Sequence, residues 1–399
     1  MNKIPIVLAS DRNCVFQLYT TILSALENKN KDTFYTFYCL IPKKFSKFIQ
    51  KKFQQLTSKY TNNKIIFICM KNAFNDVKIQ IAHITLPTFY RLKIAELLPK
   101  EEKILYLDID TIVLEDLTEL YNTSLNGFYI AGVHEIGQVV EYKRDIEYYN
   151  KIGLKNLDTY INAGVTLWNL ELIRQNDITP KLLELAKNTY RYMDQDIINL
   201  AFFGKVKLIA PKYNLMASYK KRFLDNPETK KVIYNFYGEN VIESAINSPT
   251  IIHYNTTIKP WTNKNIWLSE FWLKYAKKVP QKIDRFQKTE TGILRQLKEN
   301  KRKKIMFWGA SIFLEELFLN KKIIANKNIL GIIDKNSTKH GQKIENVEIF
   351  SPNSLEILHP DVIIFSILHN QNVIYADVKE FLQKNYPKIK LLPNTFNKK

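Results

Sequence analysis

The stretch Lys103-Ile104-Leu105-Tyr106-Leu107-Asp108-Ile109-Asp110 is an apolar run of strand length that ends in two carboxylates. Side chains alternate between the two faces of a strand, so Asp108 and Asp110 point the same way and reach one common point. Two carboxylates this close repel each other unless a proton or a cation lies between them. A hard divalent cation binds such oxygen ligands and commonly brings phosphate oxygens with it. The stretch therefore predicts a metal and phosphate site at the end of a buried strand.

Around this stretch, apolar runs of strand length alternate with amphipathic runs of helical length. The alternation predicts an α/β fold with a mostly parallel sheet. Ligands of such sheets bind beyond the carboxyl ends of the strands, so Ser10-Asp11 and Asp108-Ile109-Asp110 should meet at one cleft. The expected strands are Ile4–Ser10, Thr33–Ile41, Lys64–Cys69, Lys103–Leu107, Tyr129–Val133, Gly164–Asn169 and Thr250–His253, and the expected helices are Val15–Glu27, Lys43–Thr57 and Thr88–Leu98.

The length and the net charge of the chain limit the classes of protein to which it can belong. The 399 residues allow two or three domains, and a net charge of +20 favours an anionic partner such as nucleic acid, a membrane surface or an acidic substrate. The three cysteines form no CxxC pair, which argues against a zinc knuckle and fits a reducing compartment. No run of about 18 apolar residues occurs, so we expect a cytoplasmic protein with no transmembrane segment.

The segment 266–303 differs from what precedes it. Twelve Lys or Arg against three Asp or Glu lie between Lys274 and Lys304, and the aromatic residues Trp267, Phe271, Trp272 and Tyr275 come just before or within this run. Aromatic residues followed by basic ones are typical of an anchor at an anionic membrane surface. A solvated helical linker explains the same composition equally well.

Residues 304–399 have the pattern of a separate small, Rossmann-like α/β domain. Ile305–Trp308 is an apolar strand that enters a turn at Gly309, and the strand Ile329–Ile333 ends at Asp334. A strand, a glycine turn and an acid after the next strand are typical of a dinucleotide site, but the second and third glycines are missing. A docking or assembly module is therefore the favoured interpretation. A helix is expected at Phe313–Leu319, with further strands at Asp361–Ser366 and Lys390–Leu392.

Short blocks of sequence, in order along the chain, resemble those of the retaining glycosyltransferases of family 8, which include bacterial lipopolysaccharide galactosyl- and glucosyltransferases and glycogenin. The resemblance covers residues 4 to about 265, so it implies a domain of residues 1–265 with the GT-A-type fold of nucleotide-diphospho-sugar transferases. The blocks are Ile6–Asn13, His83 through Tyr90-Arg91-Leu92, Leu107–Asp110, Tyr160–Val165, Asp194-Gln195-Asp196, and His253 with Lys259-Pro260-Trp261.

The resemblance implies Asp108, Asp110 and His253 as ligands of Mn²⁺ (or Mg²⁺), and a UDP-sugar as the donor. Uridine would lie against the first block and the donor sugar among Arg91, Asn162, Asp194 and Gln195, with His83 near the acceptor and phosphates. The binding residues carried over are Ala9, Ser10, Asp11, Asn13, His83, Arg91, Asp108, Ile109, Asp110, Asn162, Ala163, Asp194, Gln195, His253 and Lys259.

Gln195, Asp194 and Lys259 are the catalytic residues that the resemblance implies. Glutamine is a feeble nucleophile, so we favour same-face attack, with Gln195 stabilising positive charge on the sugar ring. Lys259 would stabilise the charge that develops on the leaving diphosphate. The family often has glycine where this chain has Thr256, which alters the loop before Lys259. These residues can also have structural roles at the same time. Asp11 can form an Asx turn, and Asp194 can stabilise a helix N-terminus.

We therefore expect an Mn²⁺-dependent transferase that moves galactose or glucose from UDP-galactose or UDP-glucose to a lipopolysaccharide, lipooligosaccharide or other cell-surface glycan. Its basic surface favours a peripheral position on the inner face of the cytoplasmic membrane. The alternatives are a nucleic-acid-binding protein and a catalytically idle sugar-binding scaffold. No RNA-binding sheet signature is visible and the basic residues are not arranged along a recognition helix, so specific nucleic-acid binding is not expected.

Overall fold

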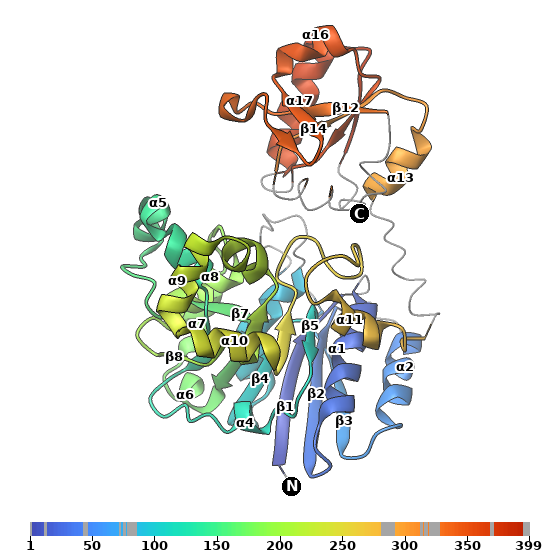
Figure 1. Cartoon of the computed structure of the whole chain (residues 1–399). Helices are drawn as coiled ribbons and strands as arrows, with labels where there is room; N and C mark the ends of the chain where they lie inside the picture. The colour runs from blue at the N-terminus through green and yellow to red at the C-terminus, as the bar shows by residue number, and fades with distance from the viewer. Residues whose placement is uncertain are drawn as a thin grey trace. The chain divides into compact units, whose positions relative to one another are not determined.

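The computed structural model describes residues 2–11, 14–42, 47–71, 73–74, 77, 86–280, 292–311, 314, 318, 328–367 and 371–393. The described residues form two compact units (Figure 1). The first contains those within 1–78, 85–256 and 270–287, and the second those within 257–269 and 288–399. Residues 257–269 belong to the second unit, because Ile258 and Ile266 pack into its core, and the chain returns to the first unit at residue 270.

A seven-stranded mixed sheet forms the centre of the first unit, in the order β3-β2-β1-β4-β7-β6-β8. The first four of these strands are mutually parallel, β7 is antiparallel to β4 and β6, and β8 is parallel to β6. The mixed, mostly parallel α/β sheet expected from the sequence is confirmed. The strands are β1 (Asn2–Ala9), β2 (Thr33–Ile41), β3 (Asn63–Cys69), β4 (Lys103–Leu107), β6 (Ile130–His134), β7 (Ile161–Asn169) and β8 (Val206–Leu208).

Helices pack against this sheet, as the nearly continuous burial of β1 and β4 requires. The helices that matter for the site are α1, α5 and α8, together with short turns at η1, η2 and η3. Their bounds are α1 (Val15–Asn28), α2 (Lys47–Thr57), η1 (Leu86–Lys93), α3 (Ile94–Leu97), α4 (Thr118–Tyr121), α5 (Ile136–Ile152), α6 (Leu170–Gln175), α7 (Ile178–Leu185), α8 (Asp194–Ala201), η2 (Pro211–Asn214), η3 (Lys220–Leu224), α9 (Pro227–Tyr237), α10 (Glu239–Asn247) and α11 (Ser269–Ala276).

The expected helix Thr88–Leu98 is not a single α-helix. The 3₁₀-helix η1 runs from Leu86 to Lys93, and only the four residues of α3 that follow are α-helical. Residues three apart eclipse one another in a 3₁₀-helix, so Thr88 and Arg91 lie on the same side of η1. The Arg91 side chain then takes the Thr88 carbonyl as its own acceptor, with Nε donating over 3.0 Å. The 3₁₀ geometry of η1 therefore directs the side chains of Thr88 and Arg91 to the same side of the helix.

A second, three-stranded sheet brings distant parts of the chain together. Its order is β5 (Thr111–Val113), β10 (Ile251–His253) and β9 (Leu215–Met216), with β10 antiparallel to β5 and parallel to β9. The register pairs His253 with Thr111, the residue that follows Asp110. The expected strand at residues 250–253 is confirmed, and its pairing explains how His253 reaches the acidic pair.

Two of the four aromatic residues expected at a membrane surface are packed inside the first unit. Trp272 and Tyr275 of α11 are buried, and the Trp272 ring lies 5.4 Å from that of Phe16 in α1. Asn28, at the end of α1, donates a hydrogen bond of 2.6 Å to the Tyr275 hydroxyl. The apolar surface of Trp272 and Tyr275 is therefore used to attach α11 to α1, so these two residues are not available to a membrane surface, and an anchor in this segment stays a prediction.

The second unit contains a six-stranded sheet in the order β13-β14-β12-β11-β15-β16, parallel except for β13. Gly309, after β11, has φ of +105°, and a Cβ there would meet the Ile367 side chain. Asp334 accepts a hydrogen bond from the Ala310 amide over 2.7 Å, so the chain itself fills this turn. The elements are α13 (Gly292–Glu299), β11 (Ile305–Trp308), β12 (Ile329–Ile333), η5 (Ser337–Lys339), β13 (Lys343–Ile344), β14 (Val347–Phe350), η6 (Pro352–Ser354), α16 (Leu355–Leu358), β15 (Val362–Phe365), α17 (Gln371–Asn385) and β16 (Lys390–Leu392).

Within the described part of the chain, every helix falls short of the length and apolarity needed to cross a bilayer. The expected helix Phe313–Leu319 lies mostly outside the described residues.

Candidate active site

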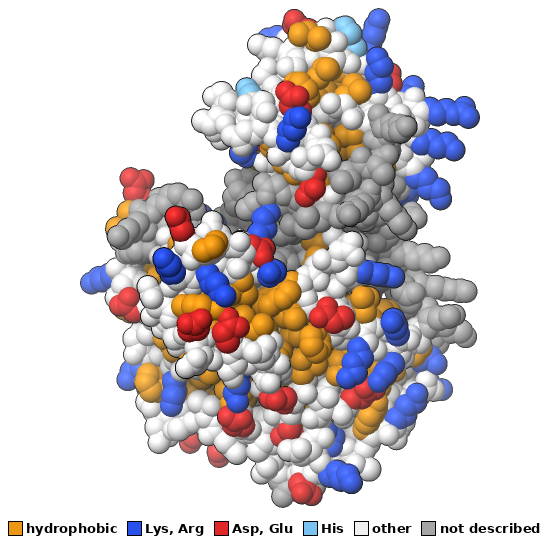
Figure 2. Space-filling model, viewed as in Figure 1, with side chains coloured by type: hydrophobic (Ala, Val, Ile, Leu, Met, Phe, Trp, Pro, Cys, Tyr) orange, Lys and Arg blue, Asp and Glu red, His pale blue; other side chains and the backbone are white. Residues whose placement is uncertain are grey.

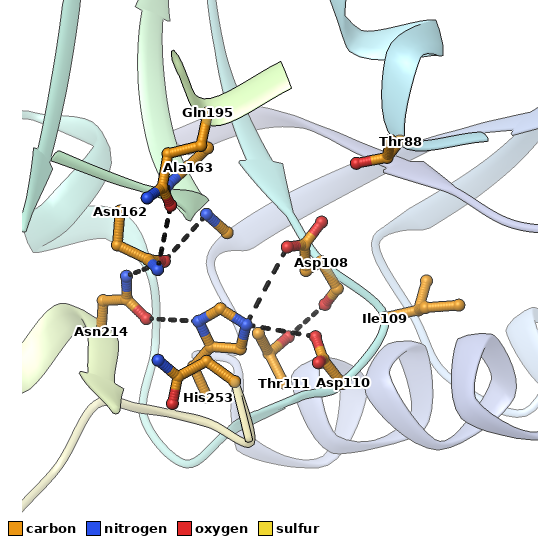
Figure 3. Close-up of polar contacts among 12 residues, drawn as sticks. Thr88, Asp108, Ile109, Asp110, Thr111, Asn162, Ala163, Gln195, Asn214 and His253 are labelled. Carbon is orange, nitrogen blue, oxygen red and sulfur yellow. Dashed lines mark hydrogen bonds and ion pairs between the residues drawn. The ribbon is translucent and has the colours of Figure 1, made fainter. Parts of the chain in front are cut away.

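Asp108, Asp110 and His253 converge at the carboxyl end of β4 (Figure 3). One ligand atom from each lies within 4.8 Å of the other two. His253 Nε2 is 3.2 Å from Asp110 Oδ1 and 3.9 Å from Asp108 Oδ2. The histidine is buried, whereas the two aspartate side chains are 28% and 18% exposed, so the cluster opens on the side of the carboxylates.

A relay of amide hydrogen bonds fixes which nitrogen of His253 faces the aspartates. The Gly164 amide donates to Asn162 Oδ1 over 3.0 Å, and so does Asn214 Nδ2. Asn214 therefore presents its oxygen, 3.0 Å away, to His253 Nδ1, which must carry the ring proton. The lone pair of Nε2 is left facing Asp110. Two carboxylates and one correctly oriented imidazole fit a divalent transition metal such as Mn²⁺, with a supporting shell already in place.

Gly164 is required by close packing at this cluster. A Cβ at this position would meet the His253 ring at both Cε1 and Nδ1, the latter at 2.8 Å, and Asp108 Oδ2 at 2.9 Å. The Gly164 carbonyl also accepts a hydrogen bond from the Asp108 amide over 2.7 Å. The glycine thus lets β7 approach both metal ligands.

Arg91 holds Asp108 on the side away from the histidine. Its Nη2 donates to Asp108 Oδ1 over 2.6 Å, its Nε lies 3.1 Å from Asp194 Oδ2, and its Nη1 donates to the Ala163 carbonyl over 2.6 Å. The guanidinium also lies 4.0 Å from the centre of the Tyr106 ring. Burial lowers the pKa of Arg91, but Asp108 and Asp194 outweigh this effect, and its pKa stays above the ordinary value.

Asp194 is a buried carboxylate at the first position of α8. Burial raises its pKa to about 6; Arg91 acts in the opposite direction and the charge of Asp108 in the same one. The Thr88 hydroxyl donates to Asp194 Oδ1 over 2.8 Å. The Asp194 carboxyl therefore gains or loses its proton close to neutral pH. It does so in contact with Arg91, the residue that also pairs with Asp108.

Gln195 and Asn162 form the opposite wall of the site (Figure 3). Gln195 Oε1 accepts hydrogen bonds from the Ala163 amide over 3.1 Å and from Asn162 Nδ2 over 3.3 Å. Asn162 Nδ2 also donates to Glu135 Oε2 over 2.9 Å. Because Gln195 Oε1 already accepts two hydrogen bonds, its expected role towards a positively charged ring requires a change of these contacts.

The residues expected to hold a nucleotide begin on the neighbouring strand. Parallel pairing of Val7 with Tyr106 places Ala9 and Ser10 beside the end of β4, with Asp11 directly after them. The Ile109 carbonyl accepts a hydrogen bond from the Thr21 hydroxyl of α1 over 2.9 Å, which fixes the loop between the two aspartates. The structure thus brings Ala9, Ser10, Asp11, Arg91, Asp108, Ile109, Asp110, Asn162, Ala163, Asp194, Gln195 and His253 into one unit.

Three other expected residues are not tested by this geometry. Asn13 and His83 lie outside the described residues. Lys259 belongs to the second unit, so its role stays a prediction.

The sequence analysis missed Thr88, Tyr106 and Asn214. Tyr106 has the strand spacing that places it on the face of Asp108, to which it donates a hydrogen bond of 3.1 Å, so periodicity could have found it. Asn214 lies 39 residues before its partner His253, and no local pattern marks it.

Comparison with known proteins places these residues in a family. Residues 5–265 match the model of Glycosyl transferase family 8. A putative glycosyltransferase of Haemophilus influenzae is 27% identical over 292 residues, which are 71% of this chain and 86% of that protein. The lipopolysaccharide 1,2-glucosyltransferase of Escherichia coli is 28% identical over 178 residues, 44% of this chain and 48% of the relative.

A solved structure of a galactosyltransferase is also similar to this chain. The galactosyltransferase LgtC, crystallised in complex with donor and acceptor sugar analogs, superimposes with a TM-score of 0.58 at 28% identity. The match covers 71% of this chain and all of LgtC. The family model does not extend to the second unit beyond residue 265.

We predict that Gly164→Ala abolishes Mn²⁺ binding without unfolding the protein. The added methyl group would overlap the His253 ring and Asp108 Oδ2, so both side chains would have to move away from β7. The rest of β7 is unchanged. Titration calorimetry with Mn²⁺ measures the affinity, and circular dichroism monitors the fold. Thr166→Ser, a small change two residues further along β7, is the control and should bind as the wild type does. Equal Mn²⁺ affinity in Gly164→Ala would contradict the assignment.

We predict that the stability difference between wild type and Asp194→Asn depends on pH. The folded carboxyl has a pKa of about 6 against 3.8 in the unfolded chain, so the folded state binds the proton more tightly. The stabilisation is present at low pH and is lost as pH rises through 6. The wild type should therefore lose roughly 3 kcal/mol relative to Asp194→Asn between about pH 3 and pH 8.

Urea denaturation at several pH values measures this difference. Only its pH-dependent part is read, because the substitution also changes the packing and the hydrogen bonds of the side chain at every pH. Asp32→Asn, at an exposed position, is the control for replacing an aspartate by an asparagine. A flat difference for Asp194→Asn would show that its pKa is ordinary.

Proposed function

The chain belongs to glycosyl transferase family 8, and we propose that it is a retaining transferase that moves galactose or glucose from a UDP-sugar to a cell-surface glycan. The observation that carries the proposal is the cluster of Asp108, Asp110 and His253 within 4.8 Å of one another. Bound Mn²⁺ would act there as a Lewis acid on the diphosphate of the donor. The name of LgtC as a galactosyltransferase, and that of the Escherichia coli relative as a glucosyltransferase, support the two sugars considered.

In the proposed reaction the chain's own residues position the reactants. The buried Arg91 holds Asp108 in position beside the proposed metal site, since its guanidinium is shared between Asp108 and Asp194. Asn162, Asp194 and Gln195 provide amide and carboxylate groups for the hydroxyls of the donor sugar, which is how a site distinguishes epimers. Lys259 would stabilise the leaving UDP, and the acceptor hydroxyl would attack from the face that UDP leaves.

The acceptor we propose is a lipopolysaccharide, lipooligosaccharide or other glycan, reached from the inner face of the cytoplasmic membrane. The Escherichia coli relative is named for lipopolysaccharide. An anionic glycolipid also suits a chain of net charge +20. Because the aromatic residues of α11 are buried, membrane association would depend on the basic residues, among which Lys301, Arg302, Lys303 and Lys304 are consecutive and exposed.

The alternative of a nucleic-acid-binding protein has less support. On the face of the first unit shown in Figure 2, Lys and Arg side chains are interspersed with Asp and Glu and form no continuous basic stripe. An idle sugar-binding scaffold would not need two carboxylates and an imidazole around one point. The enzyme and the scaffold differ in turnover, which the next experiment measures.

We predict slow release of UDP from UDP-galactose or UDP-glucose in the presence of Mn²⁺, and faster release once a suitable acceptor is present. EDTA should abolish the release and added Mn²⁺ should restore it. Asp110→Asn should lower the rate by 100-fold or more, on the order of the loss of one buried charged ligand. Asp158→Asn, at an exposed position, is the control and should retain full activity. Turnover that survives thorough chelation would refute the metal-dependent mechanism.

We also predict binding to vesicles that contain phosphatidylserine and none to pure phosphatidylcholine vesicles. Changing Lys301, Arg302 and Lys303 to Glu should reduce co-sedimentation strongly, since each basic residue near an anionic surface contributes about 1 kcal/mol. The matched control changes three exposed lysines of the same unit, Lys379, Lys384 and Lys388, to Glu. Equal loss in both triple variants would show that only the overall charge matters, and unchanged binding in both would refute the membrane proposal.

A further inference from the structure

Glu135 is a buried carboxylate next to the proposed sugar site, and it is not among the binding residues that the family resemblance implies. It follows β6 directly and its side chain is only 5% exposed. Oε2 accepts the hydrogen bond from Asn162 Nδ2 over 2.9 Å. Among the described residues, Oε1 has no hydrogen-bond partner although it is inaccessible to solvent. A buried carboxylate oxygen with no hydrogen bond is destabilising, so its retention calls for an explanation.

The relay to His253 does not need Glu135. The direction of the Asn162 side chain is already fixed by the backbone amide of Gly164, which can only donate, to Asn162 Oδ1. Asn162 Nδ2 has a second acceptor in Gln195 Oε1, 3.3 Å away. An apolar or amide residue at position 135 would leave the relay intact, so the carboxylate has another reason to be there.

Glu135 and Gln195 lie on the same side of Asn162. Their oxygens accept from one nitrogen over 2.9 and 3.3 Å, so the two acceptors can be no more than about 6 Å apart. A hydroxyl group of a sugar that contacts Gln195 and Asn162 can therefore reach Glu135. A hydroxyl that donates would satisfy the carboxylate oxygen that the chain leaves without a hydrogen bond.

Arg222 provides the complementary group. Its Nη1 lies 3.6 Å from Glu135 Oε1, too far for a hydrogen bond, and its side chain is 39% exposed. The guanidinium lies over Gly137, where a Cβ would collide with it. Arg222 belongs to η3, a π-helix, and such turns occur frequently at functional sites. Because it is half exposed, Arg222 can move slightly and admit a hydroxyl that donates to Glu135 and accepts from the arginine.

We propose that Glu135, together with Arg222, reads a hydroxyl group of the transferred sugar and is a specificity-determining residue of the donor site. The inference rests on the proposed function, because it assumes that a UDP-hexose occupies the site. It assigns a role to a carboxylate that faces Asn162 on the side opposite the relay to His253.

The test compares the affinities of the protein with Mn²⁺ for UDP, UDP-galactose and UDP-glucose by titration calorimetry. Glu135→Gln keeps the shape and can still accept from Asn162, but its amide nitrogen replaces the carboxylate oxygen that faces Arg222. We expect the ratio of the Kd for UDP to the Kd for the preferred UDP-hexose to fall about tenfold or more, as for the loss of one charged hydrogen bond. The Kd for UDP itself should not change.

Two further variants complete the design. Arg222→Gln, at a half-exposed position that tolerates substitution, should lower the same ratio while Glu135 is retained. Glu147→Gln, on the exposed side of α5, is the matched control and should leave the ratio unchanged. The affinity for Mn²⁺ in the absence of nucleotide and the thermal midpoint are measured for all variants, because a structural role of Glu135 would change these values instead.

The possible outcomes distinguish a failure of this inference from a failure of the proposed function. An unchanged ratio in Glu135→Gln and Arg222→Gln overturns the inference but leaves the proposed function standing. Equal losses for UDP, UDP-hexose and Mn²⁺ assign Glu135 to the support of the metal site and overturn the inference as well. If the wild type binds UDP but neither UDP-hexose, or binds no nucleotide, the proposed function itself fails.

Discussion

The arrangement of the site depends on the balance of charge around Asp108. This carboxylate lies close to two other acids, Asp110 and Asp194, and such a group is stable only if cations compensate it. On one side Arg91 is shared between Asp108 and Asp194, with contacts of 2.6 and 3.1 Å. On the other side the space between Asp108, Asp110 and His253 suits a divalent ion. Arg91 thus neutralises part of the charge, and a bound divalent ion would compensate the rest.

A second constraint is the distance between strands β4 and β7. The proposed metal ligands Asp108, directly after β4, and His253, in β10, come from segments of different sheets, and both lie against the backbone at Gly164. The same residue supplies the amide that orients Asn162 and, through Asn214, the ring of His253. Close approach and hydrogen bonding therefore depend on one glycine, which links the position of the metal ligands to the wall formed by Asn162 and Gln195.

The sequence allowed the local features to be predicted, and the structure explains where such prediction stops. The run from Lys103 to Asp110 indicated a buried strand followed by two neighbouring acids, and the structure places both acids in the turn directly after β4 rather than on a face of the strand. The helix expected at Thr88–Leu98 was wrong in type, since the contacts of Thr88 and Arg91 with Asp194 are tertiary. Asn214 could not be found, because its role depends on a β-sheet pairing between distant segments. Trp272 was misinterpreted for a related reason: an aromatic residue beside lysines looks the same whether it faces a membrane or helix α1.

The backbone before Asp194 shows how the protein stabilises this arrangement. Met193 has φ of +50°, a conformation that is strained for a residue with a side chain and that persists only where its surroundings enforce it. Here the next turn of the chain is fixed by Asp196, whose carboxylate accepts hydrogen bonds from the hydroxyls of Tyr148 and Tyr160, both over 2.6 Å, and from the Tyr192 amide. The strained turn at Met193 places Asp194 against Arg91 and Gln195 against Ala163 in consecutive positions. Asp196 therefore acts on the site without facing it, by holding the start of α8 in the one geometry that serves both residues.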